Sequence, residues 1–333
     1  MRKSSITPTI DLEADGINHG FLRLPHSRDD SAWGSVMIPI TVAKNGSGPT
    51  ALITAANHGD EYEGPLALTA LAASINAAEI TGRVIMVPFM NMPAFAAGTR
   101  TSPIDAGNMN RAFPGDPGGT VTEKIADYFQ RTLLPLADIV LDFHSGGKTL
   151  DFLPFAASHV LKDKEQEARC TAAREAFNAP YSMQMLEIDS FGMYDNAAEA
   201  MGKTFVTTEL GGAGTSTPET VVIARKGLRN LLIHAGILHG EIEIGPSQTL
   251  VQGDDNCFHF SPQSGMVEYC KTLGETVEQG EIIARIWDTT RTGVQPLDIH
   301  SKMDGLLAVR HTYGLIQQGD CLAVLAQKNS KES

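Results

Sequence analysis

Short apolar runs and longer amphipathic segments alternate along the chain up to about residue 240. The apolar runs have the length of buried strands and cover residues 49–56, 83–91, 138–143 and 203–210. The segments with apolar residues at helical spacing cover residues 64–82, 120–137 and 218–238. Strands that alternate with helices usually pair in parallel and need cover on both faces. The pattern therefore predicts an α/β fold with a mostly parallel or mixed sheet between two layers of helices.

Capping residues mark the starts of the predicted helices. Pro65 suits the first turn of one helix. Thr120, three residues before Glu123, forms a capping-box pattern, and Thr217 is placed to cap the last long helix. Before these helices, the pattern of residues 20–48 predicts short N-terminal β-strands and an Asn-Gly turn.

The pattern changes near residue 245, where helical spacing stops and short apolar strands separated by glycine-containing turns follow. Two stretches of this part, LGETVEQGEIIARI and YGLIQQGDCLAVLA, echo each other. They predict a small all-β, barrel-like domain with an internal repeat. We therefore divide the chain into an α/β domain, residues 1–245, and a C-terminal β domain, residues 246–330.

Composition narrows the range of partners. The 333 residues are 42% hydrophobic and 20% charged, as in an ordinary globular protein, and the formal net charge is −13. This charge argues against nucleic acid as a partner, because little is available to neutralise phosphates. We expect neither a membrane segment nor a signal peptide, since no apolar stretch approaches roughly 18 residues and none follows the basic N-terminal residues. The four cysteines are scattered, which favours reduced thiols in the cytoplasm.

Histidines and carboxylates stand where the predicted strands end. His58 and Glu61 follow the first strand, His144 follows the third, and Glu209 ends the fourth. Open parallel sheets bind ligands beyond the carboxyl ends of their strands, so we expect these side chains to meet at one edge. His58 and Glu61 alone have a simpler interpretation, a solvated acidic turn. Adding His144 and Glu209 from separate strands favours a metal site.

Two histidines and a glutamate are the ligands that catalytic metallopeptidases use for zinc, with water in the fourth position. We therefore expect His58, Glu61 and His144 to hold one Zn²⁺ per chain, which would lower the pKa of that water toward ~7. A carboxylate that is not a ligand must then take the proton and deliver it to the leaving amine. Glu209 is the acid best placed to do so.

The loop at residues 98–115 supplies positive charge for the same edge. It carries Arg100 and Arg111, with Asn110 beside the latter. A cation stabilises the oxyanion of amide hydrolysis, and an arginine can hold a substrate carboxylate through two parallel hydrogen bonds. Either arginine alone is by default a surface residue. Two of them in a loop containing glycine and proline favour a functional role.

Four sequence blocks, ANHGDEYEG, GTRTSPIDAGNMNRAFPG, DFHSGG and TTELGG, resemble the motifs of the succinylglutamate desuccinylase/aspartoacylase family. They occur in the order of that family and span most of residues 50–215. The resemblance implies the zinc carboxypeptidase fold. It also implies that His58, Glu61 and His144 bind zinc, and that Glu209 is the general base and acid.

The same resemblance assigns roles to the loop. Arg100 would polarise the scissile carbonyl, while Asn110 and Arg111 would hold the α-carboxylate of an N-acyl amino acid. The family often has an aspartate where this chain has Asn108, which puts the orientation of Arg111 in question. The C-terminal segment is similar to the β-barrel that many members append. It lacks a lysine at the hairpin tip, so we expect no covalently carried cofactor.

Within this family, the chain is most similar to the members that remove the acetyl group from N-acetyl-2,4-diaminobutyrate in ectoine degradation. We therefore expect a zinc-dependent amidohydrolase whose partner is a small N-acyl amino acid. A substrate with a free amine should meet an acidic or hydroxyl-bearing pocket. Glu187, Asp189, Tyr194 and Asp195 are candidates for it.

Other interpretations stay open. The sequence is also consistent with a desuccinylase, an aspartoacylase or a metallocarboxypeptidase. It is also compatible with a binding or assembly protein whose β domain carries the function beside a vestigial zinc site. A homodimer is an open alternative to a monomer. The remaining histidines, His159 among them, have no partner pattern and are interpreted as structural or solvent-facing.

Overall fold

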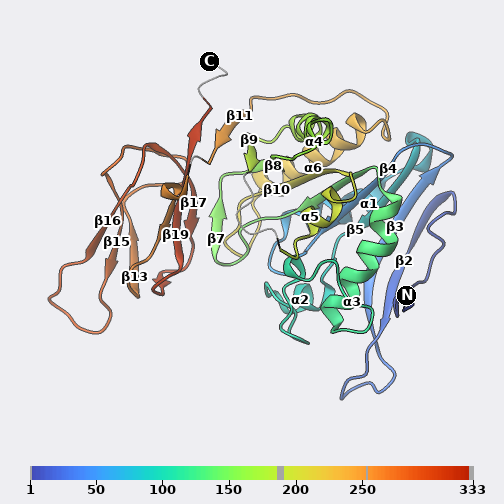
Figure 1. The fold of residues 1–333 in the computed structure, drawn as a ribbon, viewed down its shortest axis with the longest axis horizontal. Helices are drawn as coiled ribbons and strands as arrows, with labels where there is room; N and C mark the ends of the chain where they lie inside the picture. The colour runs from blue at the N-terminus through green and yellow to red at the C-terminus, as the bar shows by residue number, and fades with distance from the viewer. Residues whose placement is uncertain (1, 186–190, 253, 330–333) are drawn as a thin grey trace.

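The computed structural model describes residues 2–185, 191–252 and 254–329. Within them, one long mixed sheet crosses the molecule and a smaller antiparallel sheet lies at one end (Figure 1). The early strands of the long sheet are β1 (Thr7–Pro8), β2 (Gly16–Pro25), β3 (Ser35–Asn45), β4 (Thr50–Ala55), β5 (Gly82–Val87) and β6 (Ile139–Phe143). Its later strands are β7 (Leu150–Phe152), β8 (Phe155–His159), β9 (Tyr181–Met185), β10 (Thr204–Glu209), β11 (Gln248–Val251), β12 (Phe258–Phe260), β14 (Thr276–Val277), β17 (Gly305–His311) and β19 (Cys321–Lys328). The small sheet consists of β13 (Gly265–Tyr269), β15 (Ile282–Trp287), β16 (Leu297–His300) and β18 (Leu315–Ile316).

The long sheet mixes parallel and antiparallel pairs, as predicted. Its strand order is β1-β2-β3-β5-β4-β6-β10-β8-β9-β11-β19-β17-β14, with β12 beside β19 and β7 beside β17. The central pairs β5–β4, β4–β6 and β6–β10 are parallel. Their carboxyl ends therefore lie at one edge of the sheet, where the candidate residues were expected to meet.

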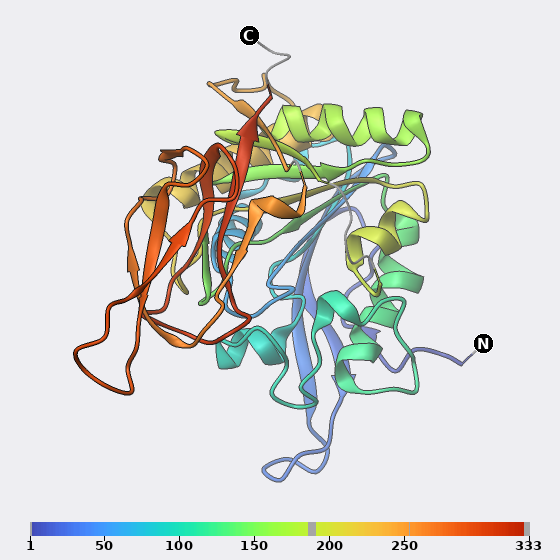
Figure 2. The ribbon, with the colours of Figure 1, turned by 60° about the vertical axis from the view of Figure 1, so that its left-hand side comes forward.

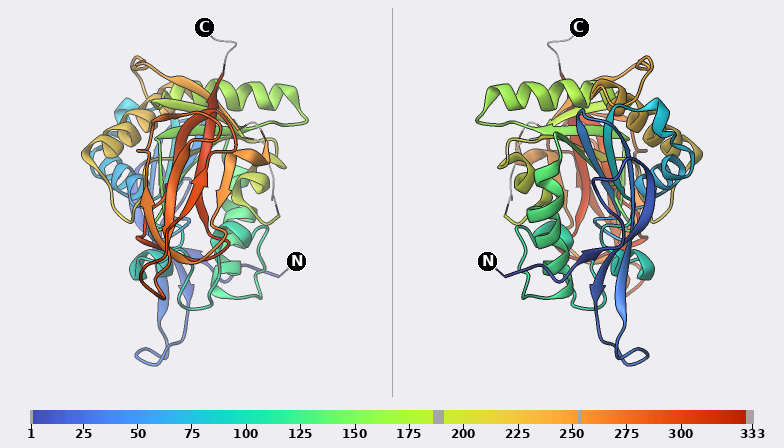
Figure 3. Two further views of the ribbon diagram at one scale, coloured as in Figure 1. Left: turned by 90° about the vertical axis from the view of Figure 1, so that its left-hand side faces the viewer. Right: turned by 90° about the vertical axis from the view of Figure 1, so that its right-hand side faces the viewer.

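Helices cover both faces of this sheet. The helices on one face are α1 (Glu63–Ser74), α4 (Lys164–Phe177) and α6 (Pro218–His234), whose apolar side chains share a core with β4, β5 and β6. On the other face lie α3 (Val121–Tyr128) and α5 (Tyr194–Glu199). The right-hand view of Figure 3 shows the strands between α3 on one side and α1 and α6 on the other. The remaining helical turns are η1 (Ala77–Glu79), α2 (Met92–Ala97), η2 (Met109–Arg111), η3 (Phe129–Leu133), η4 (Leu134–Leu136) and η5 (Asp255–Cys257).

The predicted helix starts are present, but all three helices end earlier than expected, α6 at His234 and not at residue 238. Thr120 and Glu123 form a complete capping box. The helix expected over residues 64–82 ends at Ser74, because the Asn76 side chain accepts a hydrogen bond from the Ala78 amide and starts η1 instead. The helix expected over residues 120–137 keeps regular α geometry only to Tyr128 and continues as the wider η3 and the tighter η4.

The C-terminal residues continue the same sheet. β11 pairs in parallel with β9 and antiparallel with β19, and β7 pairs with β17 (Figure 2). The small sheet packs on β14, β17 and β19 through buried side chains such as Ile286, Leu307 and Leu325. The division at residues 245 and 246 falls between α6 and β11 and stays a prediction.

The expected internal repeat is visible in the pairing of these strands. In the first copy, β14 joins the long sheet and β15 the small one; in the second, β18 joins the small sheet and β19 the long one. Each copy turns at a glycine with positive φ, Gly280 at 88° and Gly319 at 92°. Each copy therefore contributes one strand to the long sheet and one to the small sheet, and the repeat joins the two sheets.

Within the described ranges, no helix is both long and apolar enough to cross a membrane. All four cysteines are free thiols, as expected from their scattered positions.

Candidate active site

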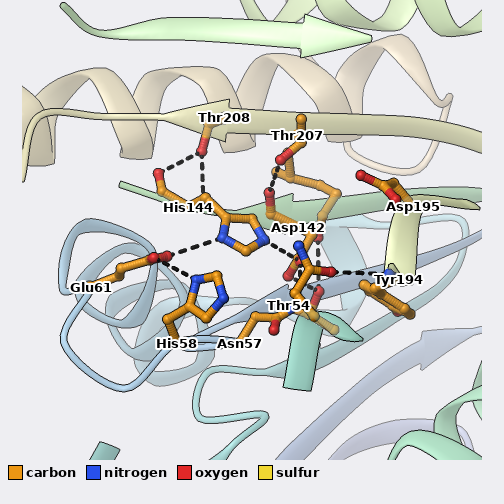
Figure 4. A network of polar contacts seen from close by, with 12 residues as sticks. Thr54, Asn57, His58, Glu61, Asp142, His144, Tyr194, Asp195, Thr207 and Thr208 are labelled. Atoms are coloured by element: carbon orange, nitrogen blue, oxygen red, sulfur yellow. Dashed lines mark hydrogen bonds and ion pairs between the residues drawn. The ribbon is translucent and has the colours of Figure 1, made fainter. Parts of the chain in front are cut away.

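Three predicted site residues meet at the carboxyl ends of β4 and β6. His58 and Glu61 lie in the loop after β4, and His144 follows β6 directly. One ligand atom from each side chain lies within 4.8 Å of the other two. Glu61 is in the middle: Oε1 is 2.7 Å from Nδ1 of His58, and Oε2 is 3.1 Å from Nδ1 of His144 (Figure 4). The two imidazoles therefore turn the same ring atom toward one carboxylate.

Close backbone packing holds the loop that carries His58. β4 is buried along its whole length, so the point where the loop begins is fixed. Ala56 takes a φ of 50°, which turns the chain sharply out of the strand. A Cβ on Gly59 would lie 2.0 Å from the carbonyl carbon of Ala94, so only glycine permits this approach to α2. The loop thereby keeps His58 and Glu61 over the end of the sheet.

Asp142 fixes the ring of His144 from behind. Nε2 of His144 donates to Oδ2 of Asp142 at 2.8 Å, which leaves Nδ1 toward Glu61. Asp142 itself accepts hydrogen bonds from Thr54 Oγ1 at 2.6 Å and from Asn57 Nδ2 at 3.0 Å. A carboxylate that orients a histidine in this way is typical of metal sites.

Burial and charge act together on these groups. Burial lowers the pKa of the His58 imidazole. Burial alone would also lower the pKa of His144, but the carboxylates of Asp142 and Glu61 outweigh it and raise that pKa well above its usual value. Burial would raise the pKa of Glu61, yet His58 and His144 hold it well below its usual range. Glu61 is therefore ionised between the two rings.

The donor set fits a divalent metal ion. Two imidazole nitrogens and a carboxylate oxygen converge in a buried place, and such ligands suit zinc and similar transition metals. The lowered pKa of His58 favours its neutral form, which is the form that binds metal. Within the part of the chain that the structure describes, no second group of this kind is found.

Glu209 ends β10, the parallel neighbour of β6. Its Oε2 atom is buried and accepts no hydrogen bond from the described residues. Burial and the negative charge of Glu61 raise the pKa of Glu209 to about 8. A buried carboxylate with a raised pKa beside a candidate metal site is the expected form of a general acid and base.

Arg100 lies at the exposed side of the cluster. Its Nη1 is 3.3 Å from Nδ1 of His58 and 3.9 Å from Oε1 of Glu61, and its side chain is 54% exposed. The structure thus brings Arg100 to the candidate metal ligands, where a guanidinium can stabilise negative charge on a substrate oxygen.

Asn110 and Arg111 lie together in η2, and Asn108 precedes them. Oδ1 of Asn110 accepts a hydrogen bond from the Tyr194 amide at 3.0 Å, which joins the loop to α5. Arg111 donates from Nη1 to the Asn110 carbonyl at 2.7 Å. Asn108, in the place of the family's aspartate, accepts from the Asn110 amide at 3.0 Å and lies 3.2 Å from Nε2 of His58. Asn108 therefore supports both the turn and a candidate metal ligand without adding charge.

A cavity of about 310 Å³ joins Glu209 and Arg111 to the C-terminal strands. Its lining includes Phe155, Met183 and Met185 from β8 and β9, together with side chains from β12, β17 and β19. His159, which the sequence pattern left without a function, also lines this cavity. No sequence signal marks it, because it is a single histidine at the end of a strand that the pattern did not predict. The C-terminal residues thus form part of the wall of the candidate active site.

The four residues considered for an amine pocket do not lie together in the structure. Glu187 and Asp189 lie outside the described residues. The Tyr194 ring is fully buried against Phe113 in the core beside α3, away from the cavity wall. Asp195 is buried, and its Oδ2 is 3.9 Å from Nε2 of His159. Of these four residues, the structure brings Asp195 next to the cavity.

Comparison with known proteins agrees with the motifs. Residues 47–235 match the succinylglutamate desuccinylase/aspartoacylase catalytic domain. N-alpha-acetyl-L-2,4-diaminobutyric acid deacetylase of Halomonas elongata is 53% identical over 328 residues, which cover 98% of this chain and 96% of that protein.

Solved structures share the fold over the whole chain. The product-bound ectoine utilization protein EutE (DoeB) from Ruegeria pomeroyi has a TM-score of 0.97 and 61% identity, covering 98% of this chain and 100% of its own. A succinylglutamate desuccinylase/aspartoacylase from Rhodobacter sphaeroides has a TM-score of 0.93 and 37% identity, with coverage of 98% and 100%. The chain therefore belongs to the succinylglutamate desuccinylase/aspartoacylase family, as its four motifs predicted.

Proposed function

We propose that the protein is a zinc-dependent hydrolase that converts N-alpha-acetyl-L-2,4-diaminobutyrate to L-2,4-diaminobutyrate and acetate in ectoine degradation. The name of the Halomonas relative supports this substrate, and the name of the Ruegeria relative supports a role in ectoine utilization. The observation that carries the chemistry is the meeting of His58, Glu61 and His144 within 4.8 Å, in the same active site as the buried carboxylate of Glu209.

His58, Glu61 and His144 would hold one zinc ion per chain. When bound, zinc supplies Lewis acidity, which eases the deprotonation of water and polarises a carbonyl group. Glu209 takes a proton from the attacking water at Oε2 as the water oxygen bonds to the acetyl carbon. Glu209 then gives this proton to the α-nitrogen as the carbon–nitrogen bond breaks, which releases acetate and the free amine. A pKa of about 8 suits a group that accepts and donates near neutral pH.

The loop residues place the substrate for this step. Arg100 donates to the acetyl oxygen as it gains negative charge. Asn110 and Arg111 hold the α-carboxylate, and Arg111 lines the cavity that also holds Glu209. The scissile bond is thereby fixed between the carboxylate anchor and the candidate metal site.

The test is a metal and substrate panel on the purified protein. Chelation should abolish hydrolysis of N-alpha-acetyl-L-2,4-diaminobutyrate, and added zinc should restore it. N-succinylglutamate, N-acetylaspartate and short peptides should be poorer substrates, which separates the deacetylase from a desuccinylase, an aspartoacylase and a carboxypeptidase. Full activity in metal-free protein would refute the mechanism. A protein that binds no metal and hydrolyses no N-acyl amino acid would instead support a binding or assembly role.

Two expectations from the sequence belong to this proposal. A cytoplasmic location agrees with four free cysteines and a metabolic substrate. A homodimer stays a prediction, which light scattering of the purified protein would test.

A further inference from the structure

A short segment after His144 connects the candidate site to the C-terminal strands. It covers residues 146–152, which we call the linking segment, and it ends in β7. Figure 1 shows β7 beside the C-terminal strands. β7 pairs antiparallel with β17, in the register Leu150 with His311, Asp151 with Arg310 and Phe152 with Val309. The position of the linking segment is therefore tied to β17.

The linking segment also holds the loop that follows Glu209. Glu209 is the last residue of β10, two residues before Gly211. Backbone hydrogen bonds join the linking segment to residues 211–214: Gly146 N donates to Gly211 O at 2.9 Å, Phe152 N to Gly211 O at 3.1 Å, Ala213 N to Leu150 O at 2.9 Å and Gly214 N to Gly147 O at 2.6 Å. The linking segment thus connects β17 to the part of the chain that carries Glu209.

The two backbones lie in direct contact. A Cβ on Gly146 or on Gly212 would lie 2.1 Å from the carbonyl oxygen of Leu150, closer than real contacts permit. Gly212 also has a φ of 146°, which favours glycine. Densely packed groups transmit small shifts, so a displacement of the linking segment must also displace the loop after Glu209.

Thr312, directly after β17, fixes the middle of the linking segment. Its amide donates to the Thr149 carbonyl at 3.0 Å, and its hydroxyl donates to the Lys148 carbonyl. At the other end of β7, the Leu153 amide donates to the Ala308 carbonyl at 2.9 Å. The hydroxyl bond of Thr312 can be removed by a conservative substitution that leaves the backbone pairing of β7 and β17 in place.

The candidate metal ligands have further supports of their own. The loop that carries His58 is held by its close packing on α2, and the ring of His144 is held by Asp142. The linking segment reaches the first of these loops through the Lys148 amide, which donates to Oδ2 of Asp60 at 2.9 Å. We therefore expect a shift of the linking segment to move the general base more than the metal ligands.

We propose that β17 positions Glu209 for proton transfer, and that Thr312 is a positioning residue that acts through the linking segment and residues 211–214. This inference rests on the proposed function, because it takes Glu209 as the general base. It goes beyond that function by giving the C-terminal strands a part in the chemical step in addition to the cavity wall. Proton transfer needs hydrogen-bond distance, so a small displacement of the carboxylate lowers its contribution to the rate.

The first test uses Thr312→Val, which keeps the shape of the side chain and removes the hydrogen bond to the Lys148 carbonyl. At saturating zinc, kcat for N-alpha-acetyl-L-2,4-diaminobutyrate should fall by roughly 3- to 10-fold, the effect of one lost hydrogen bond. KM and zinc affinity should change by less than about 2-fold. Thr312→Ser keeps the hydroxyl and should restore kcat. An unchanged kcat in Thr312→Val would overturn the proposal.

Ser301→Ala is the matched control. Ser301 is buried, and its hydroxyl donates to the Met303 carbonyl at 2.6 Å in a turn of the C-terminal part. This variant removes the same kind of hydrogen bond, so it should lower the thermal stability about as much as Thr312→Val while kcat stays unchanged. An equal fall in kcat would show that any loss of stability in the C-terminal part lowers activity, and would refute the positioning role of Thr312.

Amide hydrogen exchange gives a readout that does not depend on activity. The amides of Ala213 and Gly214, which donate to the linking segment, should exchange roughly 3- to 10-fold faster in Thr312→Val than in the wild type. Ser301→Ala should leave their exchange unchanged. Unchanged exchange of both amides in Thr312→Val would contradict the proposal.

The two measurements together separate this inference from the proposed function. Faster exchange in Thr312→Val of a protein that hydrolyses no N-acyl amino acid would contradict the proposed function alone. Hydrolysis with kcat and exchange both unchanged in the variant would contradict the positioning role alone. A fall in zinc affinity with full kcat at saturating zinc would place the effect on the metal ligands, and would also refute the role of β17 in positioning Glu209.

Discussion

In the proposed mechanism, different residues of the candidate site bind the metal and transfer the proton. Glu209 contributes no atom to the group formed by His58, Glu61 and His144. Glu209→Gln should therefore keep zinc content unchanged while kcat falls by roughly 10²- to 10⁴-fold, the usual contribution of a general base. Metal analysis and steady-state kinetics on the same preparation provide the measurement. A variant with full kcat would remove Glu209 from its role.

We expect Asp142 to contribute to metal affinity through its hydrogen bond to His144. Asp142→Asn keeps the side-chain shape but removes the charge next to Nε2 of His144. Zinc affinity should fall by roughly 10- to 100-fold, as for other residues that orient metal ligands. Titration against a competing chelator measures this. Asp298→Asn, on the exposed face of the small sheet, is a control that should not change affinity.

Arg111 is expected to recognise the substrate carboxylate. Arg111→Ala should raise KM for N-alpha-acetyl-L-2,4-diaminobutyrate by on the order of 10- to 100-fold and affect kcat less. The α-carboxamide of the same compound lacks the charge that Arg111 would bind. An equal loss on the carboxamide would contradict the anchor.

Most of the candidate site could be predicted from sequence because its residues stand at strand ends. His58, Glu61 and His144 are close since β4 and β6 are parallel neighbours, and parallel pairing follows from the alternation of strands and helices. His159 could not be predicted in the same way. Its position depends on β8 running antiparallel to β10, which no local pattern indicates.

At the scale of elements, Asp105 connects the loop at residues 98–115 to α3. It accepts hydrogen bonds from Thr122 N at 2.7 Å, Thr122 Oγ1 at 2.8 Å and Gly107 N at 3.1 Å. Burial would raise the pKa of Asp105, but these bonds outweigh it and hold the pKa below its usual value. A carboxyl whose pKa is lowered by folding adds stability above its unfolded pKa of about 3.9 and loses that contribution as the pH falls through the lower folded value.

Asp105→Asn should therefore destabilise the protein at pH 7 and have a smaller effect at pH 3. Denaturant unfolding of both proteins at the two pH values measures the difference in unfolding free energy. A difference that is constant with pH would show that the charge of Asp105 does not contribute.

The start of a helix was predictable where a capping residue precedes a clear apolar stripe. It was less predictable where the apolar stripe is weak. Thr120 and Thr217 cap α3 and α6 as expected. The pattern did not predict α4, although Asp163 caps it by accepting from the Glu165 and Gln166 amides. This helix is rich in charged residues and alanine, so its apolar stripe is weak, and it is held by packing on β8 and β10.

At the scale of the whole molecule, the shared sheet predicts unfolding in one step. β11, β19 and β17 connect the small sheet to β9 and β7, so neither part can lose its structure without exposing the other. Trp287 lies in the small sheet. In a Trp33→Phe background, the thermal transition seen by Trp287 fluorescence should coincide with the loss of helix seen by circular dichroism. Two separate transitions would show that the C-terminal part is independent.

The sequence pattern did not indicate that strands of the C-terminal part would join the sheet of the α/β part. The repeat in residues 273–326 predicted an all-β segment, and the strands are there. The pattern could not show that β11 would pair with β9, because strand pairing between distant segments depends on side-chain packing across the whole sheet.

The strand β19 gives this protein a particular order of events during its synthesis. The candidate metal ligands His58, Glu61 and His144 leave the ribosome well before Val324 and Ala326, which line the cavity. A chain that stops before residue 320 has every candidate catalytic side chain but lacks part of the cavity wall. We therefore expect such a truncated chain to lack the proposed turnover, because the substrate would meet an incomplete cavity.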